Sequence, residues 1–182
     1  DQPSYRVDLL IDEAMWPSQA MGRDVGGTPE SVADIQQKDI REYMHQQYNP
    51  ANTVVAVAGN VAHDEVVDML VESTRDWNPL EPLKWEPATD GVQGPVVKIE
   101  RRRSDQSHVC LAVPGLSLAH PDRYAFNLMN TILGDGMSSR LFLNLREEQG
   151  LAYDVQSSTS SFRDTGSLVV YCGVEPPKTN DA

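Results

Sequence analysis

The sequence has few of the side chains on which covalent and redox sites are built. It has only two cysteines, Cys110 and Cys172, in 182 residues. Their separation fits no metal-binding or redox motif. Both lie in apolar stretches of the kind that form strands, so we expect two buried free thiols. No serine or cysteine lies in a nucleophile motif, and no glycine-rich nucleotide-binding loop is present.

Histidine is equally scarce and is not clustered. The four histidines are His45, His63, His108 and His120, and neither zinc motif, H-x-x-E-H or H-E-x-x-H, occurs. The run His63-Asp64-Glu65 resembles part of a metal site. Adjacent residues of a helix point about 100° apart, however, so we interpret this run as an acidic helix start. The sequence therefore predicts no catalytic residue and no metal ligand.

Long apolar runs and positive charge are also lacking. No stretch approaches the roughly 18 apolar residues of a membrane span, and no signal peptide is recognisable. The chain has 15 basic and 27 acidic residues, a net charge of −12. Its only basic run, Arg101 to Arg103, is too short to follow a phosphate backbone. We expect a soluble protein without a membrane span and without a nucleic-acid partner.

What is present predicts an α+β fold, or mixed α/β, with a predominantly antiparallel sheet flanked by helices. Thr28-Pro29-Glu30 has the pattern of a helix start. The expected helices and strands are, in order, a helix at 39–47, a strand at 53–58 buried on both faces, a helix at 63–76, a hairpin of 96–102 with 107–113, helices at 122–133 and from Ser138 or Ser139 to Gly150, and a hairpin of 153–162 with 167–174.

The stretch 77–95 differs from its surroundings and predicts a linker. It is rich in proline and glycine, and it carries tryptophan. We expect residues 1–76 to be the end of one domain and residues 96–182 to be the start of a second. The turn Gly134-Asp135-Gly136 could bind an anion at the start of a helix, but a plain loop between two helices is the simpler interpretation.

Two side chains in GMSSRLFLNLREEQGLAYDVQSS, residues 136–158, are the candidate binding residues. Arg146 lies late in a helix, where the helix dipole favours a cation, and by itself it could be a surface arginine. Tyr153 opens the following strand and could be an ordinary strand aromatic. A guanidinium and a phenol hydroxyl are both hydrogen-bonding groups. The end of a helix and the start of the next strand can bring them to one rim.

The string LREEQGLAYDVQSS, preceded by GMSSRLF, resembles the C-terminal half of insulinase/pitrilysin-type zinc metallopeptidases, and the bacterial processing-peptidase-like branch most of all. YNPANTVVAVAGNVAHDEVVDML is similar to the end of that family's first domain, and PGLSLAHPDRYAFNLMNTILGDGMSSRLF to the opening of its second. The resemblance covers the chain from about Gly22 to Val174. It implies LuxS-like, processing-peptidase-like half domains.

The resemblance implies that Arg146 and Tyr153 bind a peptide substrate. The chain would be a non-catalytic region that positions peptides for a zinc site, located upstream in a longer chain or in a partner of a homo- or heterodimer. The alternative is an inactive structural subunit of a processing-peptidase-like complex. The short GDG loop differs from the long glycine-rich loop of the family's non-catalytic processing subunit. The resemblance also favours a bacterial, cytoplasmic protein.

The chain resembles a middle slice of the family, which raises the question of how the strand at 53–58 is completed. A strand that is apolar on both faces needs neighbouring strands. One hypothesis is a circularly permuted domain, in which this strand joins the sheet formed by the second half. The other is a swapped dimer, in which a second chain completes it.

Overall fold

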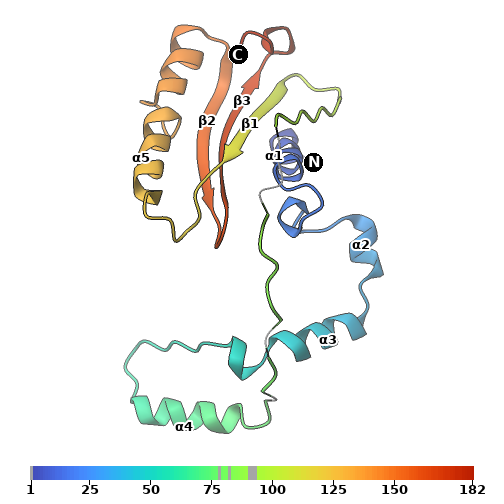
Figure 1. The fold of residues 1–182 in the computed structure, drawn as a ribbon, viewed down its shortest axis with the longest axis vertical. Coiled ribbons are helices and arrows are strands. Elements are labelled where there is room, and N and C mark those ends of the chain that lie inside the picture. The colour runs from blue at the N-terminus through green and yellow to red at the C-terminus, as the bar shows by residue number, and fades with distance from the viewer. Residues whose placement is uncertain (1, 78, 82, 90–93) are drawn as a thin grey trace. The chain divides into compact units, whose positions relative to one another are not determined.

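The computed structural model describes residues 2–77, 79–81, 83–89 and 94–182, and the chain divides into two compact units. Unit 1 consists of Asp1–Val25 and Pro87–Ala182, and unit 2 of Gly26–Glu86. Figure 1 shows the elements of both. The N-terminal residues thus pack with the second half of the chain. The assignment of 1–76 and 96–182 to successive domains of a longer protein stays a prediction, and part of the predicted linker, 77–95, lies outside the described residues.

Unit 1 contains a three-stranded antiparallel sheet. Its strands are β1 (Ser107–Pro114), β2 (Ala152–Ser161) and β3 (Gly166–Val174), in the order β1-β3-β2. The apolar β3 takes the central position, where both of its edges are paired and most of its side chains are buried. The predicted α+β fold with an antiparallel sheet is confirmed, and so is the hairpin of its last two strands.

The other predicted hairpin, 96–102 with 107–113, is wrong. β1 pairs with β3 instead, and residues 96–102 are extended without belonging to a strand. They are held by helix α1 (Pro3–Met15), which the sequence analysis missed and which packs against β1. Its apolar positions do recur at helical spacing, from Val7 to Met15, and Pro3 stands in its first turn.

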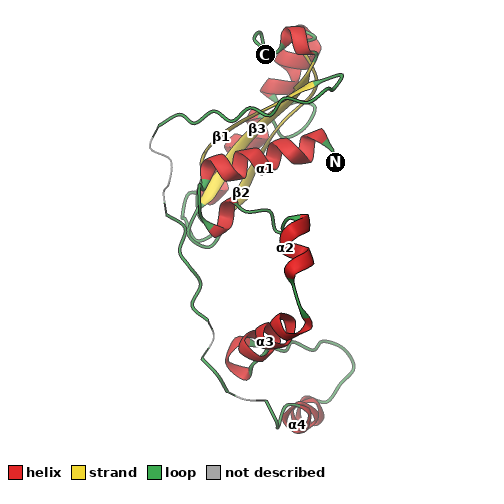
Figure 2. Cartoon of the chain, turned by 90° about the vertical axis from the view of Figure 1, so that its right-hand side faces the viewer, coloured by secondary structure: helices red, strands yellow, loops and turns green. Residues whose placement is uncertain are grey.

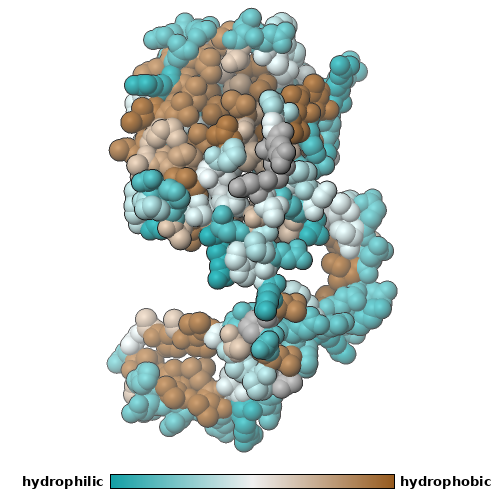
Figure 3. All heavy atoms as spheres, in the orientation of Figure 1, coloured by the Kyte–Doolittle hydropathy of each residue, from teal (hydrophilic) through white to brown (hydrophobic). Residues whose placement is uncertain are grey.

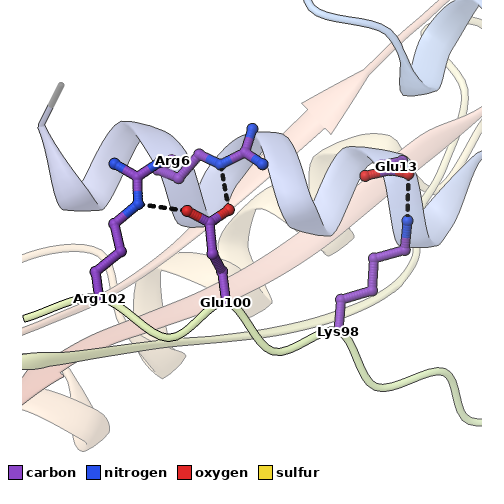
Figure 4. Close-up of polar contacts among 5 residues, drawn as sticks. All are labelled: Arg6, Glu13, Lys98, Glu100 and Arg102. Carbon is purple, nitrogen blue, oxygen red and sulfur yellow. Dashed lines mark hydrogen bonds and ion pairs between the residues drawn. The ribbon is translucent and has the colours of Figure 1, made fainter.

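Ion pairs join α1 to the extended stretch 96–102 (Figure 4). Arg6 Nε lies 2.6 Å from Glu100 Oε2, and Lys98 Nζ lies 2.6 Å from Glu13 Oε1. Arg102 pairs with the other oxygen of Glu100. Alternate residues of an extended chain point the same way, so Lys98 and Glu100 both reach partners on α1, and Arg102 lies beside Glu100. These contacts explain why this stretch follows the helix rather than β1.

Helices lie on both sides of the sheet (Figures 1 and 2). α1 contacts β1, whereas α5 (Arg123–Leu133) and the π-helix η3 (Phe142–Glu148) contact β2. The core between η3 and the sheet consists of Ala152, Val155, Cys172 and Val174, against which Leu141, Phe142 and Leu145 pack. The prediction of free thiols is confirmed: Cys172 is buried, and Cys110 is partly buried under α1.

The described residues of unit 2 form the α-helices α2 (Pro29–Asp34), α3 (Gln37–Gln47) and α4 (His63–Ser73), the short 3-10 helix Pro50–Asn52, and their connections. Thr28 caps α2 by accepting a hydrogen bond from the Ser31 amide, as the sequence predicts. Asp64 and Glu65 lie in the first turn of α4. The run at 63–65 is thus the start of a helix.

The strand predicted at 53–58 is absent from the described residues. The stretch is extended but unpaired, and Val54 is 95% exposed. The hypothesis of a circularly permuted domain is therefore wrong, because the described sheet contains only β1, β3 and β2. The stretch 53–58 is apolar on both faces, as a buried strand would be, but a strand also needs a neighbour with which to pair. Hydrophobic side chains consequently gather on the surface around this stretch and α4, and over unit 1 (Figure 3). The swapped dimer stays untested.

Candidate functional site

The helix that carries Arg146 is wound more widely than the α-helix that the sequence predicts. Within η3 (Phe142–Glu148) the backbone follows the π-helical pattern, and after it the Gln149 amide donates to the Asn144 carbonyl over 3.0 Å. The Leu151 amide then donates to the Leu145 carbonyl over 2.9 Å. Gly150, with φ +60°, adopts the left-handed conformation that ends the helix. Single π-turns are rare in proteins. Where they occur, they are frequently found at functional sites.

Tyr153 is displaced from the ladder of β2 by a bulge. Ala152 pairs with Val174 and Asp154 pairs with Gly173, so the register shifts between the two and Tyr153 is the extra residue. A bulge of this kind turns a side chain away from the regular alternation of the strand. Tyr153, 75% exposed, and Asp154 are accordingly both exposed, between the buried residues Ala152 and Val155. Neither the bulge nor the π-helix could be read from the sequence.

The two predicted binding residues come together. The guanidinium carbon of Arg146 lies 5.4 Å from the centre of the Tyr153 ring and 4.8 Å from the centre of the Phe142 ring. Such cation–π contacts hold a guanidinium flat against a ring and leave its edge N–H groups for other partners. The nearest carboxylate, Glu147, is 3.9 Å from Arg146 Nε. Phe142, which packs against the core of unit 1, is thus also a support for Arg146.

Arg146 and Tyr153 border a cavity of about 370 Å³. The turn between η3 and β2 forms one part of its wall, Gly173 of β3 another, and the turn Pro176–Lys178 a third. Lys178 Nζ lies 3.4 Å from the Gly150 carbonyl and 3.3 Å from Glu175 Oε2. The sequence analysis missed Lys178 because the signal, a lysine in a proline-containing turn, is common on any surface.

A second polar cluster lies between α1 and the opposite side of the sheet. His108 Nδ1 and the Tyr171 hydroxyl are 2.8 Å apart, and Cys110 Sγ faces Asp8 Oδ1. Burial, and then the negative charge of Asp8, raise the pKa of the Cys110 thiol to about 12. Burial also raises the pKa of Tyr171. At neutral pH these groups keep their protons, so the thiol is a poor nucleophile.

Among the described residues, no three His, Cys, Asp or Glu side chains come together as ligands for a metal ion. A structural or catalytic zinc site uses three or four such ligands. The described side chains at the cavity do not form a set of ligands that fits zinc. Arg146, Tyr153 and Lys178 instead offer N–H groups and a phenol hydroxyl there. The chemistry that Arg146, Tyr153 and Lys178 offer at the cavity is therefore hydrogen bonding and charge.

The chain belongs to the peptidase M16 inactive domain family, whose model matches residues 34–182. It is 36% identical to an uncharacterized zinc protease of Streptomyces coelicolor over 100% of its own length and 41% of that protein. It is 33% identical to an uncharacterized zinc protease of Bacillus subtilis over 95% of the chain and 42% of that protein. The chain thus spans about two fifths of these relatives.

The fold agrees with solved structures of the same family. The crystal structure of a peptidase M16 inactive domain from Pseudomonas fluorescens superposes with a TM-score of 0.75 at 21% identity, over 96% of this chain and 42% of that one. The family predicted from the LREEQGLAY region is confirmed by the family model and by the relatives named as zinc proteases. In the part of the chain that the structure describes, no helix has the length and apolar character needed to cross a membrane.

Proposed function

We propose that this chain is the substrate-binding, non-catalytic region of a zinc-dependent metalloendopeptidase. The observation that carries the proposal is the meeting of Arg146 and Tyr153 at one cavity, brought about by a π-helix and a β-bulge. Two irregular backbone features at one place are costly to keep, and both are frequent near functional sites. The relatives named as zinc proteases support the class of the longer protein.

In the proposed role Arg146 and Tyr153 position a peptide. The guanidinium, held beside the rings of Phe142 and Tyr153, can donate its N–H groups to peptide carbonyl oxygens, and the Tyr153 hydroxyl can donate or accept one further hydrogen bond. Fixing the peptide in this way lowers the entropy that is lost when it reaches the reacting centre. The zinc would be held elsewhere, in an upstream domain of a longer chain or in a partner subunit.

Binding of a labelled, unstructured peptide to the chain tests the proposal. Arg146→Ala and Tyr153→Phe should each weaken binding, by about ten- to a hundredfold for the charged residue, because a hydrogen bond to a charged group contributes about 1.5–3 kcal/mol. Arg140→Ala is the matched control, since Arg140 is an exposed arginine of the same segment and does not line the cavity. The chain alone should leave the peptide uncut.

Equal affinity of the Arg146→Ala, Tyr153→Phe and Arg140→Ala variants would contradict the proposal and favour a structural subunit. The midpoint of thermal unfolding separates binding from folding. Arg146 and Tyr153 are both substantially exposed, so their substitution should leave the midpoint within the small range of other surface changes. A large drop in the midpoint together with weaker binding would assign the pair to the fold instead.

A further inference from the structure

The cavity beside Arg146 has a second cation that the proposed function does not use. Lys178 belongs to the turn Pro176–Lys178 that follows β3, so it is contributed by a different part of the chain from Arg146 in η3. Its side chain is 39% exposed. The cavity is of a size typical of sites for small ligands or single side chains, for which about 300–1,000 Å³ is usual.

Lys178 is held in place but is not fully used by its contacts. Its ammonium lies 3.3 Å from Glu175 Oε2 and 3.4 Å from the Gly150 carbonyl oxygen. An ammonium has three N–H donors, and these two acceptors take two of them at most. The contact to Gly150 also ties the cation to the turn that joins Arg146 to Tyr153. A ligand held by those two residues would therefore lie close to Lys178.

The lining of the cavity is positive although the chain as a whole is strongly negative. Of the described residues that line it, Arg146 and Lys178 are cations and Glu175 is an acid, and the others are uncharged. The Glu175 side chain is 69% exposed. Water therefore screens its charge more than it screens the charges of Arg146 and Lys178. Glu147, which does not line the cavity, lies 3.9 Å from Arg146 Nε and offsets part of that charge. The Lys178 ammonium, which keeps an N–H donor for a ligand, is therefore the cation that favours an anionic group on the ligand.

We propose that this cavity selects peptides that carry a carboxylate next to the backbone held by Arg146 and Tyr153, and that Lys178 is the residue that sets this preference. The inference rests on the proposed function, since it names the kind of peptide that the same site takes. Gln106, which also lines the cavity, has an amide that can donate to the second carboxylate oxygen. The carboxylate can belong to an acidic side chain or to the C-terminus of the peptide.

The test compares matched peptides that differ in one carboxylate. One pair has an amidated C-terminus and carries Glu or Gln at an internal position, which is moved along the sequence. A second pair has no acidic side chain and ends in a free or an amidated carboxyl group. The wild-type chain should bind one carboxylate-bearing peptide about five times more tightly than its neutral partner, because a partly exposed ion pair contributes up to about 1 kcal/mol. The pair that shows the difference identifies the source of the carboxylate.

Lys178→Gln should reduce the ratio of the two affinities to about one, and Lys178→Arg should retain most of it. Arg140→Gln, which removes the same charge outside the cavity, should leave the ratio unchanged. The preference should also shrink when salt is raised from low to about 1 M, where the Debye length is about 3 Å. Lack of any preference in the wild type, or an undiminished preference in Lys178→Gln, would overturn the inference.

The two proposals fail in different ways. If Arg146→Ala and Tyr153→Phe weaken all peptides while acidic and neutral peptides bind alike, the inference about Lys178 fails and the proposed function stands. If Arg146→Ala and Tyr153→Phe bind every peptide like the wild type, the proposed function fails, and the inference fails with it. Circular dichroism of each variant should match the wild type, since Lys178 and Arg140 lie at the surface.

Discussion

A buried hydrogen bond between α5 and β2 makes the sharpest test of how the sheet supports the site. Ser157 Oγ donates to Asn130 Oδ1 over 2.7 Å, and Ser157 N donates to the Gly134 carbonyl over 3.0 Å. Ser157 is 5% exposed and Asn130 is 6% exposed. Gly134 must be a glycine here, since an added Cβ would lie 2.6 Å from Ser157 N. The end of α5 is thus pressed onto the strand that carries Tyr153.

Ser157→Ala keeps the strand and the amide bond to Gly134, but it leaves the Asn130 oxygen without the hydroxyl donor. An unsatisfied buried polar group costs about 1–3 kcal/mol. This loss of free energy should make local opening of β2 and β3 about 5- to 150-fold more frequent, at about tenfold for each 1.4 kcal/mol. Hydrogen exchange of the β2 and β3 amides measures that frequency. Ser158→Ala, at the next and exposed position, should change the free energy by less than about 0.5 kcal/mol.

Equal protection of the amides in Ser157→Ala and Ser158→Ala would refute the reasoning, because it would mean that the Asn130–Ser157 bond adds nothing to the packing of α5. A loss of protection confined to α5, with β2 and β3 unchanged, would also refute the claim that this bond supports the strand. The comparison is internal to unit 1, so unfolding of unit 2 does not enter it.

Two further predictions concern the polar groups between α1 and the sheet. Burial, and then the charge of Asp8, raise the pKa of Asp12, so the folded chain binds this proton more readily than the unfolded chain and stability falls as pH rises through the shifted pKa. Asp12→Asn should therefore raise the thermal midpoint at pH 7, and the gain should vanish below the ordinary value of 3.8; a gain that persists at pH 3 would contradict this. With its pKa raised to about 12, Cys110 should be alkylated at pH 8 at least about tenfold more slowly in the folded chain than in urea, because less thiolate is present, as mass spectrometry can measure; equal rates would show that burial and Asp8 do not protect it.

Local patterns in the sequence were sufficient for most helices and for one hairpin. Thr28-Pro29 marks the start of α2, the period of apolar residues marks α3 and α4, and the alternating stretches after Gly150 mark β2 and β3. These features depend on caps and on side-chain spacing within a few residues, which sequence alone contains. The same holds for the family, because LREEQGLAY and its flanking strings are contiguous. The helix α1 belongs with these features, since its apolar residues from Val7 to Met15 recur at helical spacing.

Features that depend on distant partners required the tertiary structure. The apolar pattern of 53–58 predicts a buried strand, but pairing depends on a neighbour that the described sheet does not provide. The alternation of 96–102 predicts a partner for β1, but ion pairs of Lys98 and Glu100 to α1 hold that stretch beside a helix more than 80 residues away in sequence. Both are contacts between residues far apart in the chain, and spacing within a segment carries no information about them.

The candidate site shows the same division. Arg146 and Tyr153 became candidates through the resemblance of the LREEQGLAY region, since each by itself could be an ordinary surface arginine or strand aromatic. How they meet depends on a π-helix, on the bulge opposite Val174 and Gly173, and on the Phe142 ring under the guanidinium. Lys178 joins them only because β3 returns its far end to the start of β2. Side-chain chemistry is local to the sequence, whereas the geometry that combines it arises from strand pairing and packing between distant segments.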